Sequence, residues 1–134
     1  LAEDRKYSRS EIKVNTDSDS MEAAGLNTVY FPFNSANLRN SARNALERNS
    51  NFLRNHPNVR IQVEGHCDER GSVQYNLALG ERRSQSVKDY LVATGVNPNR
   101  ITTISFGKER PLALGHDEMS WSKNRRGNFV IIGK

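Results

Sequence analysis

The hydrophobic residues of this chain recur with two periods. A period of two residues, typical of β-strands with one buried face, is clearest in residues 59–64, where Val59, Ile61 and Val63 alternate with polar side chains. Because proline cannot donate a main-chain hydrogen bond, Pro32 either places the first strand at a sheet edge or ends it there. The other predicted strands are residues 27–33, 100–107 and 127–133.

A period of three to four residues, typical of amphipathic helices, appears in two longer stretches. The first predicts a helix over residues 36–55, with Asn34 or Ser35 as its N-terminal cap. The second predicts a helix over residues 73–94, which ends before a glycine. A further short helix is expected near residues 117–123, in the connection to the last strand.

The predicted elements follow one another as β-α-β-α-β-(α)-β. Strand–helix–strand units place their strands in parallel through a right-handed crossover. We therefore expect an α/β sandwich of two layers over residues 26–134, with a four-stranded mixed sheet and the helices on one face. Residues 1–25 are rich in Ser, Asp, Glu and Lys, a composition that predicts a flexible or loosely docked linker.

Composition narrows the classes of function only slightly. The net charge is +5 and arginine supplies fourteen of the twenty cations, a balance that suits carboxylate, phosphate or nucleic-acid ligands without choosing among them. The single cysteine excludes an intrachain disulfide and a cysteine-based zinc site. The chain has no run of 18 apolar residues, the length that a membrane-spanning helix requires. The leucine at position 1 suggests a processed or truncated piece.

The densest chemistry lies in residues 64–87. On a helical wheel, Arg83 falls in the middle of the hydrophobic stripe of the second helix, and Asn76 and Leu79 lie on the same stripe. A guanidinium group on a buried face is costly unless a carboxylate of the protein or of a ligand pairs with it. Asp68, in the loop that leads into this helix, is the natural candidate.

Two interpretations of this pair stay open. Ligands of open α/β sheets bind beyond the carboxyl ends of strands. A carboxylate, a guanidinium and the free amides of a loop that contains Gly65 and Gly71 would suit a zwitterion such as an amino acid there. Alternatively, Asp68 and Arg83 form an internal salt bridge that only fixes the loop.

Three other kinds of site are disfavoured. His66 and Cys67 are consecutive on an extended chain, so their side chains point apart, which argues against a catalytic dyad. No further ligands at a familiar spacing accompany His66 and Asp68, so we expect no metal. The arginines of the first helix spread around its wheel and no nucleic-acid or phosphate-binding motif occurs, so we expect no nucleic-acid partner. We expect neither an enzyme nor a cofactor.

The stretch EGHCDERGSVQYNLALGERRSQSVKDYL resembles the signature of the OmpA-like peptidoglycan-binding domains, and more narrowly that of the peptidoglycan-associated lipoproteins (Pal) of Gram-negative bacteria. VYFPFNSANL before it and SFGKERPLALGHDEMSWSKNRR after it match the same family in order and spacing. The resemblance covers about residues 27–132, and it implies the OmpA-like version of the fold expected above.

In that family the domain grips the meso-diaminopimelate side chain of the peptidoglycan stem peptide, and an Asp and an Arg clamp its charged ends. The resemblance assigns these roles to Asp68 and Arg83, which favours a ligand over the internal salt bridge. The further ligand-binding residues that we assign are Phe33, Asn34, Ser35, Asn37, Cys67, Gly71, Asn76, Leu79 and Arg125, with Arg126 close to the site.

Two positions depart from the family pattern. The family often has FDFD where this chain has FPFN, so Asn34 adds no negative charge and an ammonium group would depend more on Asp68. Cys67 stands where threonine is common. Because a thiol is a weak hydrogen-bond donor, we expect only the main-chain amide of Cys67 to serve the ligand.

The resemblance also implies a cellular role. Such proteins tether the outer membrane to the cell wall as part of the Tol-Pal system, with TolB as a further partner. A lipidated N-terminal cysteine, absent from this chain, anchors them on the periplasmic side of the outer membrane. Residues 1–25 would then be the remnant of the linker. The alternative is the same clamp in another envelope or motor complex.

Overall fold

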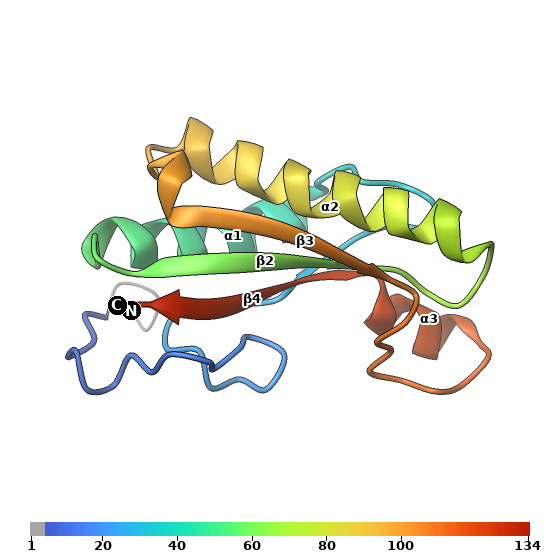
Figure 1. Ribbon diagram of the computed structural model, residues 1–134, viewed down its shortest axis with the longest axis horizontal. Helices are drawn as coiled ribbons and strands as arrows, with labels where there is room; N and C mark the ends of the chain where they lie inside the picture. Colours follow the sequence, from blue (N-terminus) through green and yellow to red (C-terminus); the bar gives the residue numbers. More distant parts are fainter. Residues whose placement is uncertain (1–4) are drawn as a thin grey trace.

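The computed structural model describes residues 5–134, and within them four strands form one mixed sheet in the order β1-β4-β2-β3. β2 and β3 are parallel, and β4 runs antiparallel to both β1 and β2. α1 and α2 cover one face of the sheet and α3 lies beyond its end (Figure 1), so the predicted two-layer α/β fold is confirmed. The elements are β1 (Val29–Tyr30), α1 (Asn40–Asn55), β2 (Arg60–His66), α2 (Val73–Ala93), the 3-10 helix η2 (Pro98–Arg100), β3 (Ile101–Gly107), α3 (Glu118–Asn124) and β4 (Arg126–Gly133).

The hydrophobic core lies between the sheet and the two long helices. The alternating residues Ile61 and Val63 of β2 are fully buried, as the period of two predicts. Full burial of a side chain of this size contributes about 1.5–3 kcal/mol. Their partners in this core include Leu46, Phe52 and Leu53 of α1, Val87 and Leu91 of α2, and Phe129 and Ile131 of β4.

The segment between β1 and α1 is longer and less regular than predicted. β1 has two residues and ends before Pro32, which cannot continue the hydrogen-bond ladder. Asn34 has a φ of +53°, a left-handed conformation that turns the chain. The helix begins only at Asn40, and its N-terminal cap is Arg39, whose side chain makes no capping hydrogen bond. The predicted caps, Asn34 and Ser35, therefore serve the loop and not the helix.

A close contact between two glycines seats α2 on the sheet. The helix begins at its predicted residue, where the hydroxyl of Ser72 accepts a hydrogen bond from the N–H of Tyr75 at 3.0 Å. A Cβ atom on Gly65 of β2 would lie 1.8 Å from the main-chain oxygen of Gly80 in α2, and one on Gly80 would lie 2.1 Å from Oγ of Ser105. Only hydrogen fits at either position, so the backbone of α2 can approach the end of β2 closely.

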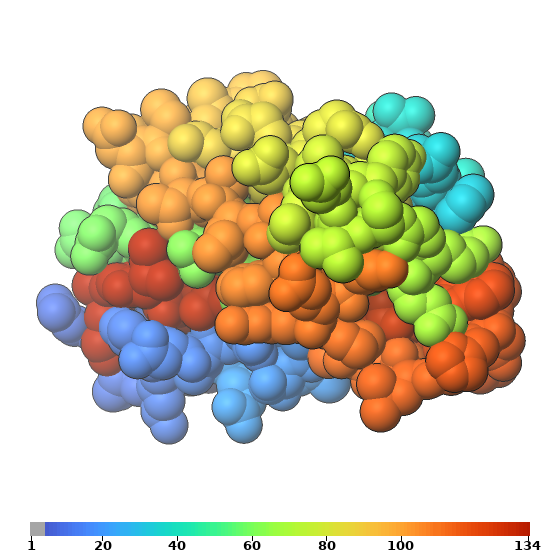
Figure 2. All heavy atoms as spheres, turned by 45° about the vertical axis from the view of Figure 1, so that its right-hand side comes forward, coloured from blue at the N-terminus to red at the C-terminus, as the bar shows by residue number. Residues whose placement is uncertain are grey.

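The N-terminal segment departs from the predicted linker. Residues 5–25 pack against the domain, and both views place this blue segment beside the red β4 (Figures 1 and 2). Ile12 and Ala23 are buried in the hydrophobic core, whereas Val14 and Met21 of the same segment stay exposed. The other residues of the predicted linker, 1–4, lie outside the part of the chain that the structure describes.

Main-chain hydrogen bonds hold this segment on the edge of β4 that the short β1 leaves unpaired. The N–H of Asn15 donates to the oxygen of Ile131 at 2.8 Å, and the N–H of Ser18 donates to the oxygen of Phe129 at 2.9 Å. The segment thus continues the sheet edge. The composition of the segment is that of a linker, but composition does not show whether polar residues find hydrogen-bond partners on a strand, as these do.

Candidate functional site

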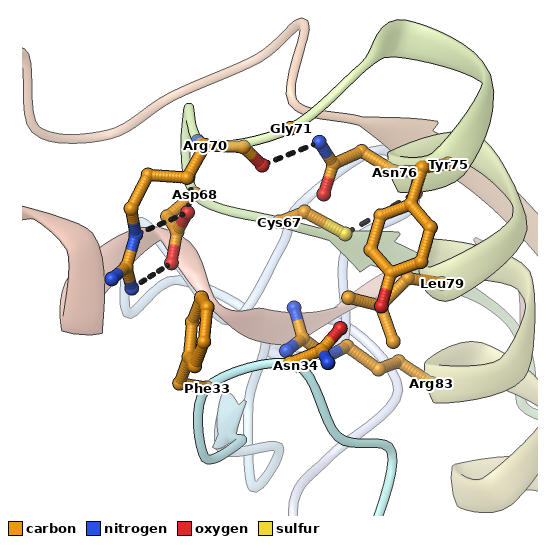
Figure 3. Close-up of a pocket in the computed structure, with 10 residues that line it drawn as sticks. All are labelled: Phe33, Asn34, Cys67, Asp68, Arg70, Gly71, Tyr75, Asn76, Leu79 and Arg83. Atoms are coloured by element: carbon orange, nitrogen blue, oxygen red, sulfur yellow. Dashed lines mark hydrogen bonds and ion pairs between the residues drawn. The ribbon is translucent and has the colours of Figure 1, made fainter.

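A pocket of about 430 Å³ opens beyond the carboxyl end of β2, between the loop that leads into α2 and the loop after β1 (Figure 3). This is where ligands of open α/β sheets bind. Its lining combines eight of the predicted site residues with Arg70 and Tyr75, which the sequence analysis did not select. The lining residues are Phe33, Asn34, Cys67, Asp68, Arg70, Gly71, Tyr75, Asn76, Leu79 and Arg83.

Arg83 is fully buried, as its place on the hydrophobic stripe predicts. Within residues 5–134 the guanidinium group is bonded to no carboxylate, because it donates to main-chain oxygens instead, so the internal partner, one of the two alternatives, is not found. Nε donates to Ser35 at 2.9 Å, Nη1 to His66 at 2.9 Å and Nη2 to Pro32 at 3.0 Å. These bonds tie the loop after β1 to the end of β2. Burial lowers the pKa of Arg83, because its positive charge has dipoles and no bonded anion around it.

Asp68 pairs with Arg70 and not with Arg83. Its Oδ1 accepts from the main-chain N–H of Arg70 at 3.0 Å and from Nε at 3.2 Å, and its Oδ2 accepts from Nη2 at 2.8 Å. Nη1 of Arg125 lies 3.5 Å from the same Oδ2. The internal Asp68–Arg83 salt bridge is therefore not formed among the described residues. Burial alone would raise the pKa of Asp68, but the hydrogen bonds from Arg70 outweigh it and lower the pKa below its usual value.

The guanidinium group of Arg70 is held between two aromatic rings. Its central carbon lies 4.0 Å from the ring centre of Phe33 and 4.0 Å from that of Trp121, a geometry in which a cation is attracted to both ring faces. Figure 3 shows Arg70 paired with Asp68 on one side of the pocket, with Phe33 next to them. The net result is a pocket with excess positive charge, because Arg70 compensates Asp68 while no carboxylate of residues 5–134 is bonded to Arg83.

Cys67 and Asn76 form the wall between these charges. The thiol of Cys67 donates to the main-chain oxygen of Asn76 at 3.2 Å. The main-chain N–H of Cys67, expected to serve the ligand, donates to the oxygen of Gly107 at 2.8 Å and so already has a partner within the protein. The side-chain amide of Asn76 donates to the main-chain oxygens of Arg70 and Ser72, both at 2.9 Å. Burial raises the pKa of the Cys67 thiol, which disfavours a thiolate nucleophile.

Comparison with known proteins establishes the family. The model of the OmpA family matches residues 30–125, most of the chain. The chain belongs to the OmpA family. The sequence motifs that predicted this membership span the loop with Asp68 and the helix with Arg83, so the residues of the pocket lie within the OmpA-family match.

Named relatives narrow the branch of the OmpA family. This chain is 46% identical over 109 residues to a peptidoglycan-associated lipoprotein of Pseudomonas aeruginosa, which covers 81% of the chain and 64% of the relative. It is 47% identical over 105 residues to that of Rhizobium meliloti, which covers 78% and 60%. The chain therefore spans less than two thirds of the length of either relative.

Solved structures agree with this placement in the OmpA family. The peptidoglycan-associated lipoprotein of Burkholderia pseudomallei matches with a TM-score of 0.75 and 41% identity, over 78% of this chain and 88% of that one. The C-terminal domain of Helicobacter pylori MotB matches with a TM-score of 0.74 and 25% identity, over 80% and 84%. None of these names is that of an enzyme, which agrees with the prediction that this OmpA-family chain is not one.

Four predicted residues lie outside the pocket lining of this OmpA-family domain. Ser35 acts through its main-chain oxygen on Arg83, and Asn37 is exposed in the loop before α1. Arg125 is buried behind Asp68. Arg126 points elsewhere, because its Nε donates to Asp19 of the N-terminal segment at 2.8 Å. Arg126 thus helps to hold that segment and not a ligand in the pocket.

The side chains of His66 and Glu64, also in residues 64–87, do not line the pocket. Nε2 of His66 lies 2.9 Å from Oε1 of Glu64, and the His66 ring stacks on Phe106 with 5.6 Å between ring centres. His66 and Cys67 therefore have different partners, as predicted. Within residues 5–134 no group of three or more His, Cys, Asp or Glu side chains could hold a metal ion, and no helix is long and apolar enough to cross a membrane.

The two lining residues that the sequence analysis did not select, Arg70 and Tyr75, have only weak signals in the sequence. Arg70 is two residues after Asp68, close enough for a turn in which both its main chain and its side chain reach that carboxylate, but the pairing depends on the turn geometry. Tyr75 belongs to the first turn of α2 and is 43% exposed, so the hydrophobic stripe does not select it. A search for aromatic side chains near the predicted charges would have found Tyr75 but not the ring pair around Arg70.

Proposed function

We propose that this chain is a non-catalytic module that binds peptidoglycan through the diaminopimelate residue of the stem peptide. Diaminopimelate ends in a carbon that carries both an ammonium and a carboxylate group. The pocket offers a cation and an anion that are anchored separately, which are the two charges that such an end requires. The names of the relatives associate them with peptidoglycan, which supports this polymer as the source of the ligand.

The observation that carries this proposal is the buried, uncompensated charge of Arg83. Its three hydrogen bonds go to neutral carbonyl oxygens, so the side chain is held rigidly but its charge is not neutralised. A carboxylate that enters the pocket supplies the missing anion in a place of low dielectric constant, where charge-assisted interactions are strong. Asp68, on the same pocket, is the anion available for the ammonium group.

The wider role that we propose rests on the family alone. The module would tether the outer membrane to the cell wall from the periplasmic side, through a lipid anchor outside this chain, as part of the Tol-Pal system. TolB would be a protein partner. This part is tested by capture of purified TolB on the immobilised chain, with and without a diaminopimelate peptide; no binding under either condition would remove TolB from the proposal.

The test of the ligand is calorimetric titration with a diaminopimelate-containing muropeptide. The matched control is the same muropeptide with lysine in place of diaminopimelate, because lysine keeps the ammonium group and lacks the carboxylate. We expect binding of the first and at least about tenfold weaker binding of the second, since the charge on Arg83 loses its partner. Equal affinities for the two peptides would show that Arg83 does not bind the carboxylate group of diaminopimelate.

Two variants complete this test. Asp68→Asn keeps the shape of the side chain and removes its charge, so we expect much weaker binding with a folded domain. Arg82→Met is the control, because Arg82 is the exposed neighbour of Arg83 on α2 and does not line the pocket. If the parent chain ignores the diaminopimelate peptide, the proposed ligand is wrong and the pocket charges are structural.

A second assignment is the same module in another envelope or motor complex. The likeness to the C-terminal domain of MotB, with a TM-score of 0.74, shows that the fold alone does not separate the two. Among the solved structures, the higher identity to a peptidoglycan-associated lipoprotein, 41% against 25%, favours the first assignment. Both assignments use the same pocket, so the titration tests them together.

A further inference from the structure

The carboxylate of Asp68 has little capacity left for a ligand. A carboxylate offers about four acceptor positions, and Arg70 fills two on Oδ1 and one on Oδ2. The remaining position faces Nη1 of Arg125 at 3.5 Å. An ammonium group of a ligand can therefore form a full set of hydrogen bonds to Asp68 only if one of the two guanidinium groups moves away.

Arg70 is the group that can leave. Its side chain is 33% exposed, against 9% for Arg125. Arg125 is also bonded to the main-chain oxygen of Phe31 at 2.9 Å and to Glu118 at 2.7 Å, and those bonds would break with it. Among the described residues, the side chain of Arg70 has hydrogen bonds to Asp68 alone.

Part of what holds Arg70 lies outside the pocket. Trp121, one of the two rings that stack on its guanidinium group, is not a lining residue. The indole N–H of Trp121 donates to Oε2 of Glu69 at 2.7 Å, and Nδ1 of His116 lies 2.7 Å from the same oxygen. Glu69 thus holds the Trp121 ring in place, and that ring in turn holds the guanidinium group of Arg70.

We propose that Arg70 is a displaceable latch on Asp68. The proposal rests on the proposed function: the ammonium group of the ligand takes the place of the Arg70 side chain on the carboxylate. Glu69, acting through Trp121, sets how readily the latch opens. Arg70 is then a competitor of the ligand, and Glu69 is a positioning residue that never touches it.

The latch has a definite thermodynamic consequence. In the empty pocket it keeps Asp68 paired, so the carboxylate is not left buried without a partner. Every ligand cation must first open it, so the observed affinity is reduced by the fraction of molecules in which Asp68 is free. A weaker latch therefore gives tighter binding, whereas loss of a direct ligand contact would give weaker binding. The two roles predict changes of opposite sign.

The experiment compares the parent chain with Arg70→Met, which keeps an unbranched apolar stem and removes the guanidinium group. We expect Arg70→Met to bind the diaminopimelate muropeptide about tenfold more tightly, a change of about 1.4 kcal/mol, and to unfold at a lower temperature when empty. Unchanged or weaker binding by a folded Arg70→Met variant would overturn the latch. If that variant does not fold, Arg70→Lys serves instead. It cannot form the bidentate, stacked arrangement, so the same increase in affinity is expected in smaller degree, and its absence has the same meaning.

Trp121 provides an independent readout, because it is the single tryptophan of the chain. In the parent we expect its fluorescence to change when the muropeptide binds, because the stacked cation moves away. Arg70→Met should bind without that change. Glu69→Ala should bind about two- to threefold more tightly than the parent, as expected for loss of an exposed contact, and Glu69→Gln, which can still accept from the indole N–H, should restore the parent affinity.

The outcomes separate this proposal from the one on which it rests. If the parent does not bind the muropeptide, the proposed function fails and the latch falls with it. If the parent binds and its tryptophan emission stays constant, the ligand does not move Arg70, and the latch alone is wrong.

Discussion

Arg83 and Asp68 line the same pocket, yet neither is a hydrogen-bond partner of the other. Arg83 donates to the main-chain oxygens of three residues, and Asp68 accepts from Arg70 at distances down to 2.8 Å. Each charge is therefore anchored by its own set of contacts. Removal of one does not leave the other without its partners, so the two can be tested independently.

Replacement of Arg83 by methionine is expected to destabilise the domain by roughly 2–4 kcal/mol. Three main-chain oxygens lose their donors, and a buried acceptor without a partner costs on the order of 1–3 kcal/mol, although removal of an uncompensated buried charge offsets part of this. Urea denaturation measures the free energy of unfolding. Arg82→Met is the control and should stay within about 0.5 kcal/mol of the parent. A similar small effect at Arg83 would mean that its bonds to the loop after β1 are not formed in solution.

The stability of the domain should fall in acid, in part through Asp68. Hydrogen bonds from Arg70 outweigh burial and lower the pKa of Asp68 in the folded state, and the pKa of Glu64 is also lowered, as its bonds to His66 and Asn128 outweigh burial. A lowered folded pKa gives stability that is present above the unfolded value, about 3.9 for aspartate, and is lost as the pH falls through the folded value. The free energy of unfolding should therefore decline below about pH 5.

The variant Asp68→Asn isolates one part of that decline. It should be less stable than the parent at pH 7, and the difference should shrink as the pH falls toward 3. Urea denaturation of both proteins at several pH values measures this difference. A gap that stays constant over the range would mean that the carboxylate of Asp68 has the same pKa in the folded and unfolded chains.

Replacement of Gly65 by alanine should destabilise the domain by roughly 3 kcal/mol or more, the upper range for overpacking in a core. The added Cβ would lie 1.8 Å from the main-chain oxygen of Gly80, and backbone atoms cannot rotate away as a side chain does. Gly127→Ala on β4 is the control, since its Cβ would meet Val87 at an ordinary 3.5 Å. Thermal unfolding compares the two. Equal melting temperatures would mean that α2 does not sit as close to β2 as described.

The packed N-terminal segment makes a prediction that a flexible linker would not. Ile12 is 3% exposed, so Ile12→Ala should cost roughly 2–4 kcal/mol. Val14→Ala is the control because Val14 is 40% exposed, and it should cost less than about 1 kcal/mol. Hydrogen exchange should also show protection of the Asn15 and Ser18 amides, which are bonded to β4. Free exchange at both positions would restore the linker interpretation.

The regular part of the fold could be predicted because its burial has a period. The alternation of Ile61 and Val63 predicted a strand with one buried face, and the stripe on the second helix placed Arg83 inside the molecule. The packing of residues 5–25 could not be predicted in this way. Two buried apolar residues, Ile12 and Ala23, are too few to show a period, and the remaining contacts depend on which edge of β4 is left open.

The partners of the site residues were the least predictable part. The sequence indicated that Arg83 needs partners, but it could not indicate main-chain oxygens, because every residue has one and only the fold selects among them. The same limit applies to Arg70. Its attachment to Asp68 requires a local turn, and its place between Phe33 and Trp121 requires that two distant segments meet there.

The docking of the N-terminal segment on β4 determines how the domain would resist a pulling force. Nζ of Lys134 donates to the main-chain oxygen of Arg9 at 3.1 Å, at the end of the sheet opposite to the pocket (Figure 1). A pull between the N-terminal segment and a ligand in the pocket would thus act along the strands. Ladder hydrogen bonds lie across the strand direction, so those of Asn15 and Ser18 would be loaded together in shear and would have to fail together, and not one after another as in the opening of a zipper.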